Sequence, residues 1–144
     1  MRRDADATVL AFDFGTRRIG VAVGNTLVRV AHPLATIAAA DPAARWSAIR
    51  ALLDEWRPQR LVVGLPLHAD ASEHAMTARA REFARELSER FALPVALEDE
   101  RHTSEIARDA LAAAGRGGRA HRALRDRVAA QIILQAWLDG HHDA

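Results

Sequence analysis

The sequence predicts an α/β protein in which helices flank a mixed five-stranded sheet, with residues 1–144 forming a single domain. Two observations lead to this prediction. Short apolar runs separated by turn residues fill the start of the chain, which is typical of an antiparallel meander. Helical and strand-like segments then alternate, which favours parallel strands joined by helical crossovers. The 49 % share of hydrophobic residues suits one globular unit with a buried core.

The first three predicted strands form the meander. Residues 8–12 are an apolar run that indicates a buried strand, and residues 18–23 indicate a second. Gly24 and Asn25 supply a turn. We expect residues 27–30 to pair back as the third strand.

A helix and a buried strand follow. Asp41 before Pro42 is an N-cap with proline at the first helical position, and the helix is expected to run to about Trp56. Residues 60–63 form a short strand closed by Gly64. Their Leu-Val-Val sequence suits a strand that is buried on both faces.

The second half of the chain continues the alternation. The predicted elements are, in order, a helix over residues 73–90 capped by Ser72, a strand over 95–97, a helix from Thr103 or Ser104 to Ala114, a loop over 115–118 and a last helix over 121–139. Right-handed crossovers should place the two later strands parallel to the first.

Composition excludes several classes of protein. The chain has no cysteine, which removes disulfides, thiolate metal ligands and cysteine nucleophiles. No apolar stretch approaches the roughly 20 residues that span a bilayer, and no signal-peptide pattern is present, so we expect a cytoplasmic protein. The net charge of +1 does not by itself indicate a nucleic-acid partner.

Carboxylates stand at two predicted strand ends. Asp13 ends an apolar strand, where desolvation is costly unless something balances the charge, although an Asx-turn before Gly15 would also explain it. Glu98, Asp99 and Glu100 follow a later strand, where three adjacent acids repel one another unless they are solvated or hold a cation. Because neighbouring strand residues point to opposite faces, only one of Asp99 and Glu100 can share a site with Asp13.

Asp126 is the third unusual carboxylate. On a helix it shares a face with apolar residues at steps of three and four, and this stripe must pack on the sheet. The stripe consists of Ala129, Ala130, Ile133, Leu134 and Trp137. Asp126 therefore starts the buried face, although a first-turn acid is also favoured by the helix dipole.

Together these acids suggest a metal site. Carboxyl ends of strands form the ligand-binding edge of an α/β sheet. Three carboxylates, without cysteine or a set of three histidines, select a hard cation such as Mg²⁺ or Mn²⁺. Two such ions, about 3.5–4 Å apart, can activate water and stabilise the leaving oxygen of a phosphodiester.

Basic residues flank the acids. Arg116, Arg119, Arg122 and Arg125 recur every third residue just before Asp126. We expect this local basic patch to contact phosphates, which gives affinity without reading sequence.

Four motifs resemble those of the YqgF family, also called RuvX, of Holliday junction resolvase-like nucleases. They occur in the family's order, at residues 13–20 (Asp-Phe-Gly-Thr-Arg-Arg-Ile-Gly), 63–67 (Val-Gly-Leu-Pro-Leu), 99–104 (Asp-Glu-Arg-His-Thr-Ser) and 126–130 (Asp-Arg-Val-Ala-Ala). The resemblance implies an RNase H-like fold and processing of the 5′ end of pre-16S rRNA. A role on Holliday junctions follows more loosely, from similarity to RuvC.

The resemblance also implies site residues. Asp13, Glu100 and Asp126 would be the catalytic acids and the ligands of two Mg²⁺ or Mn²⁺ ions, with Asp99 as the rival for the second position. Three further arginines flank the acids and are candidates for phosphate binding: Arg17, Arg18 and Arg101.

Two features depart from the family pattern. Residues 68–72, His-Ala-Asp-Ala-Ser, stand where the family usually has Asn-Met-Asp-Gly-Thr, and the missing glycine removes easy access to positive φ. His102 stands where the family often has leucine. His68 and His102 are candidate site residues, although loop histidines are commonly solvated.

Several functions remain open from the sequence. The main hypothesis is a nuclease acting on structured RNA, within a ribosomal precursor particle, as a monomer or weak dimer, with branched DNA as the alternative substrate. Asp-Phe-Gly-Thr also resembles the phosphate-binding turn of the actin and Hsp70 ATPases, which makes a nucleotide-binding module a second hypothesis. A third is a ribosome-associated RNA-binding protein with little catalysis.

Overall fold

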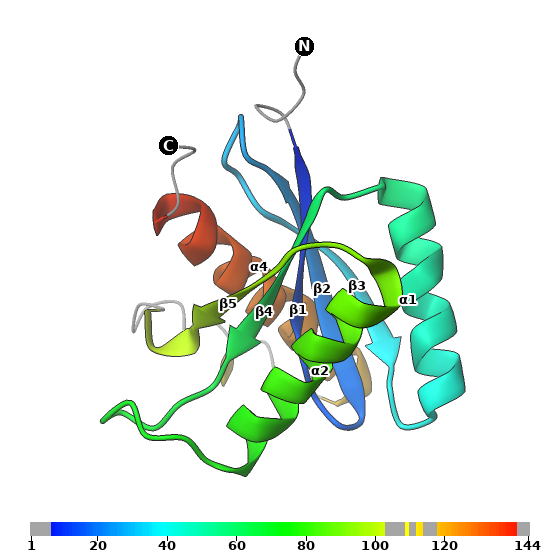
Figure 1. The fold of residues 1–144 in the computed structure, drawn as a ribbon. Helices are drawn as coiled ribbons and strands as arrows, with labels where there is room; N and C mark the ends of the chain where they lie inside the picture. The colour runs from blue at the N-terminus through cyan, green and yellow to red at the C-terminus, as the bar shows by residue number, and fades with distance from the viewer. Residues whose placement is uncertain (1–6, 103–108, 110–111, 114–117, 141–144) are drawn as a thin grey trace.

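The computed structural model describes residues 7–102, 109, 112–113 and 118–140 (Figure 1). These residues form one sheet with helices on both of its faces. The elements are β1 (Thr8–Asp13), β2 (Arg18–Asn25), β3 (His32–Ala38), α1 (Pro42–Trp56), β4 (Arg60–Leu65), α2 (Ala75–Phe91), β5 (Val95–Asp99), the 3₁₀ helix η2 (Glu100–His102) and α4 (Arg119–Gly140). No helix of the described residues is long and apolar enough to cross a membrane.

The sheet has five strands in the order β3-β2-β1-β4-β5. β1 pairs antiparallel with β2, and β2 pairs antiparallel with β3. β4 and β5 lie parallel to β1, joined through helical crossovers. The predicted mixed sheet, with a meander followed by parallel strands, is confirmed.

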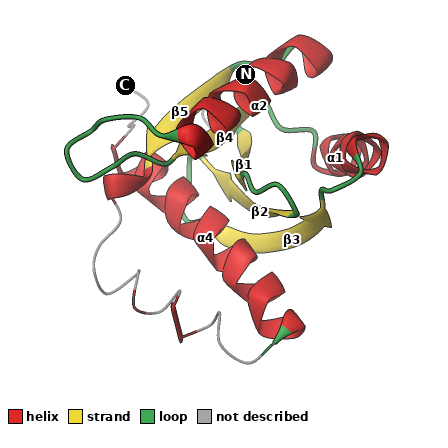
Figure 2. Cartoon of the chain, turned by 90° about the horizontal axis from the view of Figure 1, so that it is seen from below, coloured by secondary structure: helices red, strands yellow, loops and turns green. Residues whose placement is uncertain are grey.

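The helices cover the two faces of the sheet unequally. Figure 2 shows α1 and α2 on one side of the strands and α4 crossing the other side. One core cluster joins the first face to α1 and α2, through side chains such as Ile49 and Phe83. The second cluster joins Val9 and Ala22 to the apolar stripe of α4, through Ile133 and Leu134. Strands buried on both faces are therefore apolar at successive positions, as predicted for residues 60–63.

The third strand was predicted at the wrong place. Residues 27–30 form a loop, and β3 begins at His32. The Asn25 side chain accepts hydrogen bonds from the backbone N–H groups of Leu27 and Val28, at 2.7 and 3.2 Å, and so closes a turn. Arg29 then adopts a left-handed conformation at φ 63°. The turn is longer than predicted because the backbone N–H groups of Leu27 and Val28 bond to the Asn25 side chain, and the third strand starts only at His32.

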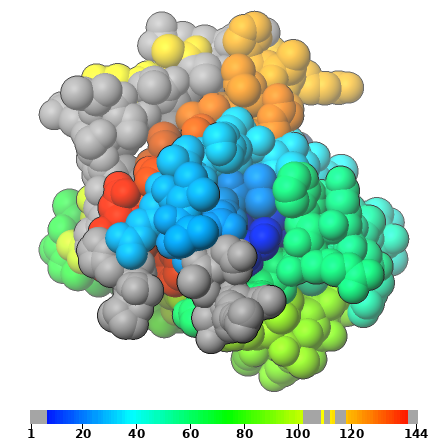
Figure 3. Space-filling model, turned by 90° about the horizontal axis from the view of Figure 1, so that it is seen from above, coloured from blue at the N-terminus to red at the C-terminus, as the bar shows by residue number. Residues whose placement is uncertain are grey.

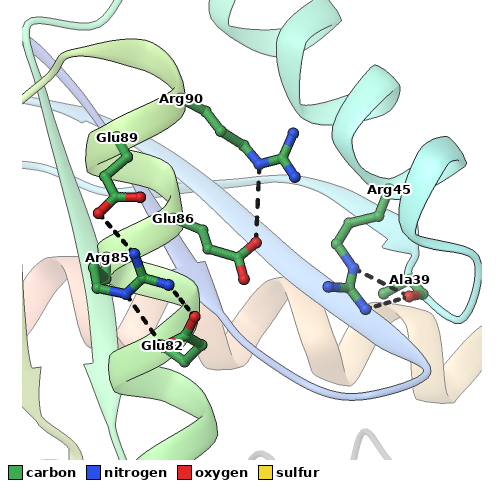
Figure 4. Close-up of polar contacts among 7 residues, drawn as sticks. All are labelled: Ala39, Arg45, Glu82, Arg85, Glu86, Glu89 and Arg90. Carbon is green, nitrogen blue, oxygen red and sulfur yellow. Dashed lines mark hydrogen bonds and ion pairs between the residues drawn. The ribbon is translucent and has the colours of Figure 1, made fainter.

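α1 begins and ends where the sequence predicted. Asp41 caps it by accepting a hydrogen bond from the Ala43 N–H at 3.3 Å, and Pro42 is the first helical residue. Arg45 donates to the main-chain carbonyl of Ala39 through Nε and Nη2, at 3.1 and 2.7 Å (Figure 4). These contacts fasten the first turn of α1 to the segment that follows β3.

α2 begins two residues later than predicted, with His74 as its N-cap in place of Ser72. The Ser72 hydroxyl instead donates to the Asp70 carboxylate at 2.6 Å, inside the preceding loop. The Thr77 hydroxyl accepts a hydrogen bond from the His74 N–H and donates to the Pro66 carbonyl. The helix start is therefore set by a contact to the end of β4 rather than by the nearest serine.

The outer face of α2 carries ion pairs within the helix. Arg85 bridges Glu82 and Glu89, and Arg90 lies 3.8 Å from Glu86 (Figure 4). Glu86 is one-third exposed and the other four side chains about half exposed or more, so each pair contributes about 0.5 kcal/mol or less.

α4 starts beside the outer edge of the meander. The Thr36 hydroxyl on β3 donates to the carbonyl of Ala123 at 2.7 Å, and Figure 3 shows the orange first turns of α4 against the cyan surface of that region. α4 begins at Arg119, two residues before the predicted start. Within the predicted helix from Thr103 or Ser104 to Ala114, the structure describes residues 109 and 112–113, which are helical, and the rest of that helix and most of the loop over 115–118 lie outside the described residues.

Candidate functional site

Asp13 is the last residue of β1, the central strand of the sheet. It is half-buried between neighbouring elements. Burial, followed by the negative charges of Glu100 and Asp126, raises the pKa of Asp13 to about 8, and the positive charge of Arg125 opposes the shift. The three acids that the sequence singled out are therefore close enough to influence one another's charge.

Asp99 and Glu100 have different surroundings. The Asp99 carboxylate receives the Arg101 guanidinium at 2.6 Å and the Arg101 backbone N–H at 2.9 Å. A β-carbon added to Gly64 would lie 2.7 Å from Oε2 of Glu100, so the Glu100 carboxylate rests against the bare end of β4. Burial, followed by the charge of Asp99, raises the pKa of Glu100. Of the two rivals, Glu100 is the one whose charge acts on Asp13.

The strand before these residues is less solvated than its acidic sequence suggests. Glu98 on β5 is only 5 % exposed and pairs in register with Gly64. Glu98 is therefore not solvated, whereas Asp99 and Glu100 are partly exposed.

Asp126 lies on the buried face of α4, as its spacing predicted, and is 9 % exposed. Its main-chain carbonyl sits directly over Gly20 of β2. Its carboxylate accepts a hydrogen bond from Nε of Arg18 at 2.5 Å, an ion pair that joins residues 108 positions apart. Because α4 begins at Arg119, Asp126 lies beyond the first turn, and the alternative of a first-turn acid favoured by the helix dipole is wrong.

A cavity of about 310 Å³ opens between the end of β1 and the start of α4. Two acids and three arginines line it: Asp13, Arg17, Arg18, Arg125 and Asp126. The structure thus brings together three of the seven predicted phosphate-binding arginines with two of the three predicted acids. The cavity has anionic and cationic walls, as a site for a metal-bound phosphate would need.

The other predicted arginines lie elsewhere. Arg101 is held by Asp99 and also donates to the Ala69 carbonyl at 3.2 Å, so it braces the loop between β4 and α2. Arg119 and Arg122 are exposed on the first turns of α4, ahead of Asp126. Arg116 lies outside the described residues.

The two candidate histidines do not enter this cavity. His68 lies in the loop after β4 with its ring centroid 4.7 Å from that of His74. The side chain of His102 lies outside the described part of the chain.

Two glycines matter more than the sequence suggested. A β-carbon at Gly20 would come within 1.8 Å of the Asp126 carbonyl oxygen, and one at Gly64 would press on Ile133 and Glu100. The missing side chain of Gly20 leaves space for the Asp126 backbone, and that of Gly64 leaves space for the Glu100 carboxylate. The signal available in the sequence was a glycine inside an apolar strand, which often marks a close approach of another element.

The donor set fits a hard divalent cation, because three carboxylates supply only oxygen ligands. Burial and then the negative charges of Glu100 and Asp126 raise the pKa of Asp13, and such a cation would neutralise these charges. In the described residues, however, no three acidic or histidine side chains converge closely enough to enclose an ion as they stand. The chemistry of the ligands fits, and their final convergence needs side-chain movement.

The sheet order and the acids at one sheet end define the class of the protein. A five-stranded mixed sheet with carboxylates after the first and last strands and on the C-terminal helix has the RNase H-like architecture. The structure of Thermus thermophilus RuvC in complex with a Holliday junction substrate superposes with a TM-score of 0.53 at 18 % identity, covering 90 % of this chain and 92 % of that one. A second Thermus thermophilus RuvC structure has a TM-score of 0.51 at the same identity, covering 93 % of this chain and 95 % of that one.

Sequence comparison gives the family. Residues 7–140 match the family RuvX, described as Holliday junction resolvase. A protein of Chromobacterium violaceum is 53 % identical over 131 residues, covering 90 % of this chain and 96 % of that protein. One of Nitrosomonas europaea is 49 % identical over 144 residues, covering 100 % of this chain and 97 % of the relative. Both bear the provisional name pre-16S rRNA nuclease. The chain belongs to the RuvX family.

Proposed function

We propose that this protein is a metal-dependent nuclease that hydrolyses phosphodiester bonds at the 5′ end of pre-16S rRNA. The observation that carries the proposal is the gathering of Asp13, Glu100 and Asp126 from three separate elements at one end of the sheet. Such a concentration of buried negative charge destabilises the fold unless a cation offsets it. A site that costs stability in this way is typical of a functional one.

The acids would serve as ligands of Mg²⁺ or Mn²⁺. Asp13 and Glu100 supply oxygens from the carboxyl ends of β1 and β5, and Asp126 supplies them from α4. Bound divalent ions would lower the pKa of water and stabilise charge on the leaving oxygen. The protein's own part is to hold the carboxylates at fixed points of a rigid sheet edge, which limits the reorganisation needed during reaction.

Arginines around the acids would hold the nucleic-acid backbone. Arg17 and Arg125 line the same cavity as Asp13, and a guanidinium can donate two hydrogen bonds to the oxygens of one phosphate. Arg119 and Arg122 extend the positive surface along the first turns of α4. Such contacts give affinity that depends on salt and not on base sequence.

The choice of substrate rests on the relatives. Proteins about half identical to this one over nearly their whole length bear the name pre-16S rRNA nuclease. We infer that this chain acts on the same RNA, in the cytoplasm, while the RNA is part of a ribosomal precursor particle. A monomer suffices for such a substrate.

The test is cleavage of a labelled pre-16S rRNA fragment with Mg²⁺, Mn²⁺ or EDTA. The wild type is compared with Asp13→Asn, Glu100→Gln and Asp126→Asn, and with Asp54→Asn on the exposed surface of α1 as a control. We expect metal-dependent cutting that each site variant reduces by about 10³-fold or more and the control retains. Full activity of Asp126→Asn would contradict the proposed site.

Branched DNA is the second candidate substrate, because the family is described as Holliday junction resolvase. A four-way DNA junction therefore runs beside the RNA in the same experiment. A junction has two-fold symmetry, so junction cleavage should come with a dimer in solution. Tight RNA binding without cutting of either substrate would instead support a ribosome-associated binding protein.

A further inference from the structure

The contact between Arg18 and Asp126 occupies one of the proposed ligands. Nε of Arg18 lies 2.5 Å from Oδ2 of Asp126, and the two side chains are 33 % and 12 % exposed. A charge-assisted hydrogen bond of this length, with the carboxylate mostly shielded from water and the guanidinium one-third exposed, is stronger than an ion pair between two fully exposed side chains. In this arrangement a positive charge from β2 already offsets the Asp126 carboxylate.

The backbone of Asp126 has little freedom to move. Its carbonyl packs against the α-carbon of Gly20, in a gap that could not hold even one added carbon. The side chains of Ala130 and Ile133 follow it into the core. A change in what the carboxylate faces must therefore come from rotation of its side chain rather than from a shift of α4.

Asp13, Glu100 and Asp126 lie near one another, but their carboxylates do not converge on a position where one ion could bind. Charge from Glu100 and Asp126 reaches Asp13. Even so, no three acidic or histidine side chains in the described ranges are close enough to coordinate one ion. Within the described part of the chain, the Arg18 guanidinium is the group that binds the Asp126 carboxylate.

We propose that Arg18 is a positioning residue that takes the place of a divalent cation at Asp126 and must release this carboxylate before the metal site closes. The inference rests on the proposed function of the site. Once released, Arg18 remains on the wall of the cavity that Asp13 and Arg17 also line, where a phosphate would be bound. Binding of the metal and of the phosphate would then favour each other, because the metal becomes the new partner of Asp126 and the phosphate that of Arg18.

The test measures Mn²⁺ binding to the full chain, without nucleic acid, by electron paramagnetic resonance titration. Arg18→Gln is compared with wild type and with Arg50→Gln, which removes the same charge from an exposed position on α1. We expect Arg18→Gln to bind Mn²⁺ about tenfold more tightly, since the competing charge-assisted bond is gone. Arg50→Gln should change the affinity by much less.

The same titration in an Asp126→Asn background distinguishes two explanations for tighter Mn²⁺ binding: release of the Asp126 carboxylate, and the mere loss of one positive charge near the site. We expect Arg18→Gln to give no gain there, because the competition is for that carboxylate. As a second readout, Mg²⁺ should shift the Arg18 Nε–H resonance of the wild type, assigned by its loss in Arg18→Gln.

Three results would overturn the inference. Unchanged or weaker Mn²⁺ binding by Arg18→Gln is one, and an equal gain in the Asp126→Asn background is another. In both cases the wild type still binds metal, so the proposed function survives. Absence of Mn²⁺ binding by every variant would overturn the inference and the metal-dependent function together.

Discussion

The main-chain carbonyl of Asp126 lies directly against the α-carbon of Gly20, so that a β-carbon there would come within 1.8 Å of the oxygen. This contact joins the start of the buried face of α4 to β2 with no side chain between them. The contact fixes the distance of the Asp126 backbone from the sheet. It also places Asp126 near the end of β1, because Gly20 pairs in register with Asp13.

Gly20→Ala should therefore damage the protein more than any exposed glycine substitution. We expect a loss of about 2–4 kcal/mol in the free energy of unfolding, because the added methyl group must push α4 off the sheet. Urea denaturation measures this loss. Gly140→Ala is the matched control, since nothing lies within 4 Å of a β-carbon there, and equal stabilities of the two variants would contradict the packing argument.

Asp99 and Glu100 should differ sharply in function. Glu100→Gln is expected to reduce the single-turnover rate constant of cleavage by about 10³-fold or more, because it removes a proposed metal ligand. Asp99→Asn weakens a pair with Arg101 that is partly exposed, which costs about 1 kcal/mol or less of stability and leaves most of the activity. The comparison is made under single-turnover conditions with the labelled RNA. A greater loss in Asp99→Asn would mean that Asp99 is the ligand.

The metal-free protein should become less stable as pH rises. The pKa of Asp13 is about 8 in the folded chain against an ordinary value of 3.8, so the folded state keeps its proton over a range in which the unfolded state loses it. Stability is therefore greatest below the ordinary pKa and is lost as pH rises toward the folded value, and the raised pKa of Glu100 acts in the same direction.

Asp13→Asn tests this dependence. In EDTA at pH 8 the variant should be more stable than the wild type by about 1–3 kcal/mol, and the difference should shrink toward pH 4. Urea denaturation at a series of pH values gives both curves. Parallel curves would show that the Asp13 charge carries no such cost.

The arginines at the start of α4 should control the salt dependence of RNA binding. Arg119→Gln and Arg122→Gln are each expected to lower the slope of log affinity against log salt by about 1, if each contacts one phosphate. Arg50→Gln, on α1 at the opposite face of the sheet, is the control. Filter binding across a salt series makes the measurement, and an unchanged slope in both variants would exclude this surface from the RNA path.

Much of the fold was predictable from local patterns. The Asp41–Pro42 start of α1 and the apolar strands β1 and β4 follow from capping and from side-chain periodicity, which act between near neighbours. The third strand and the start of α2 were misplaced. In both cases a polar side chain outweighed the nearest sequence signal: Asn25 Oδ1 accepts a hydrogen bond from the Leu27 N–H, and the Thr77 hydroxyl donates one to the Pro66 carbonyl.

The sequence by itself determined the order of the elements and the three acids worth testing, because strand ends and helical faces are properties of short segments. Only the tertiary structure decided between Asp99 and Glu100, by pairing the first with Arg101 and setting the second against Gly64. It alone brought Arg18 to Asp126 across 108 positions. Contacts of this kind depend on how whole elements pack, and no local propensity encodes the distance between two residues that meet only in the folded chain.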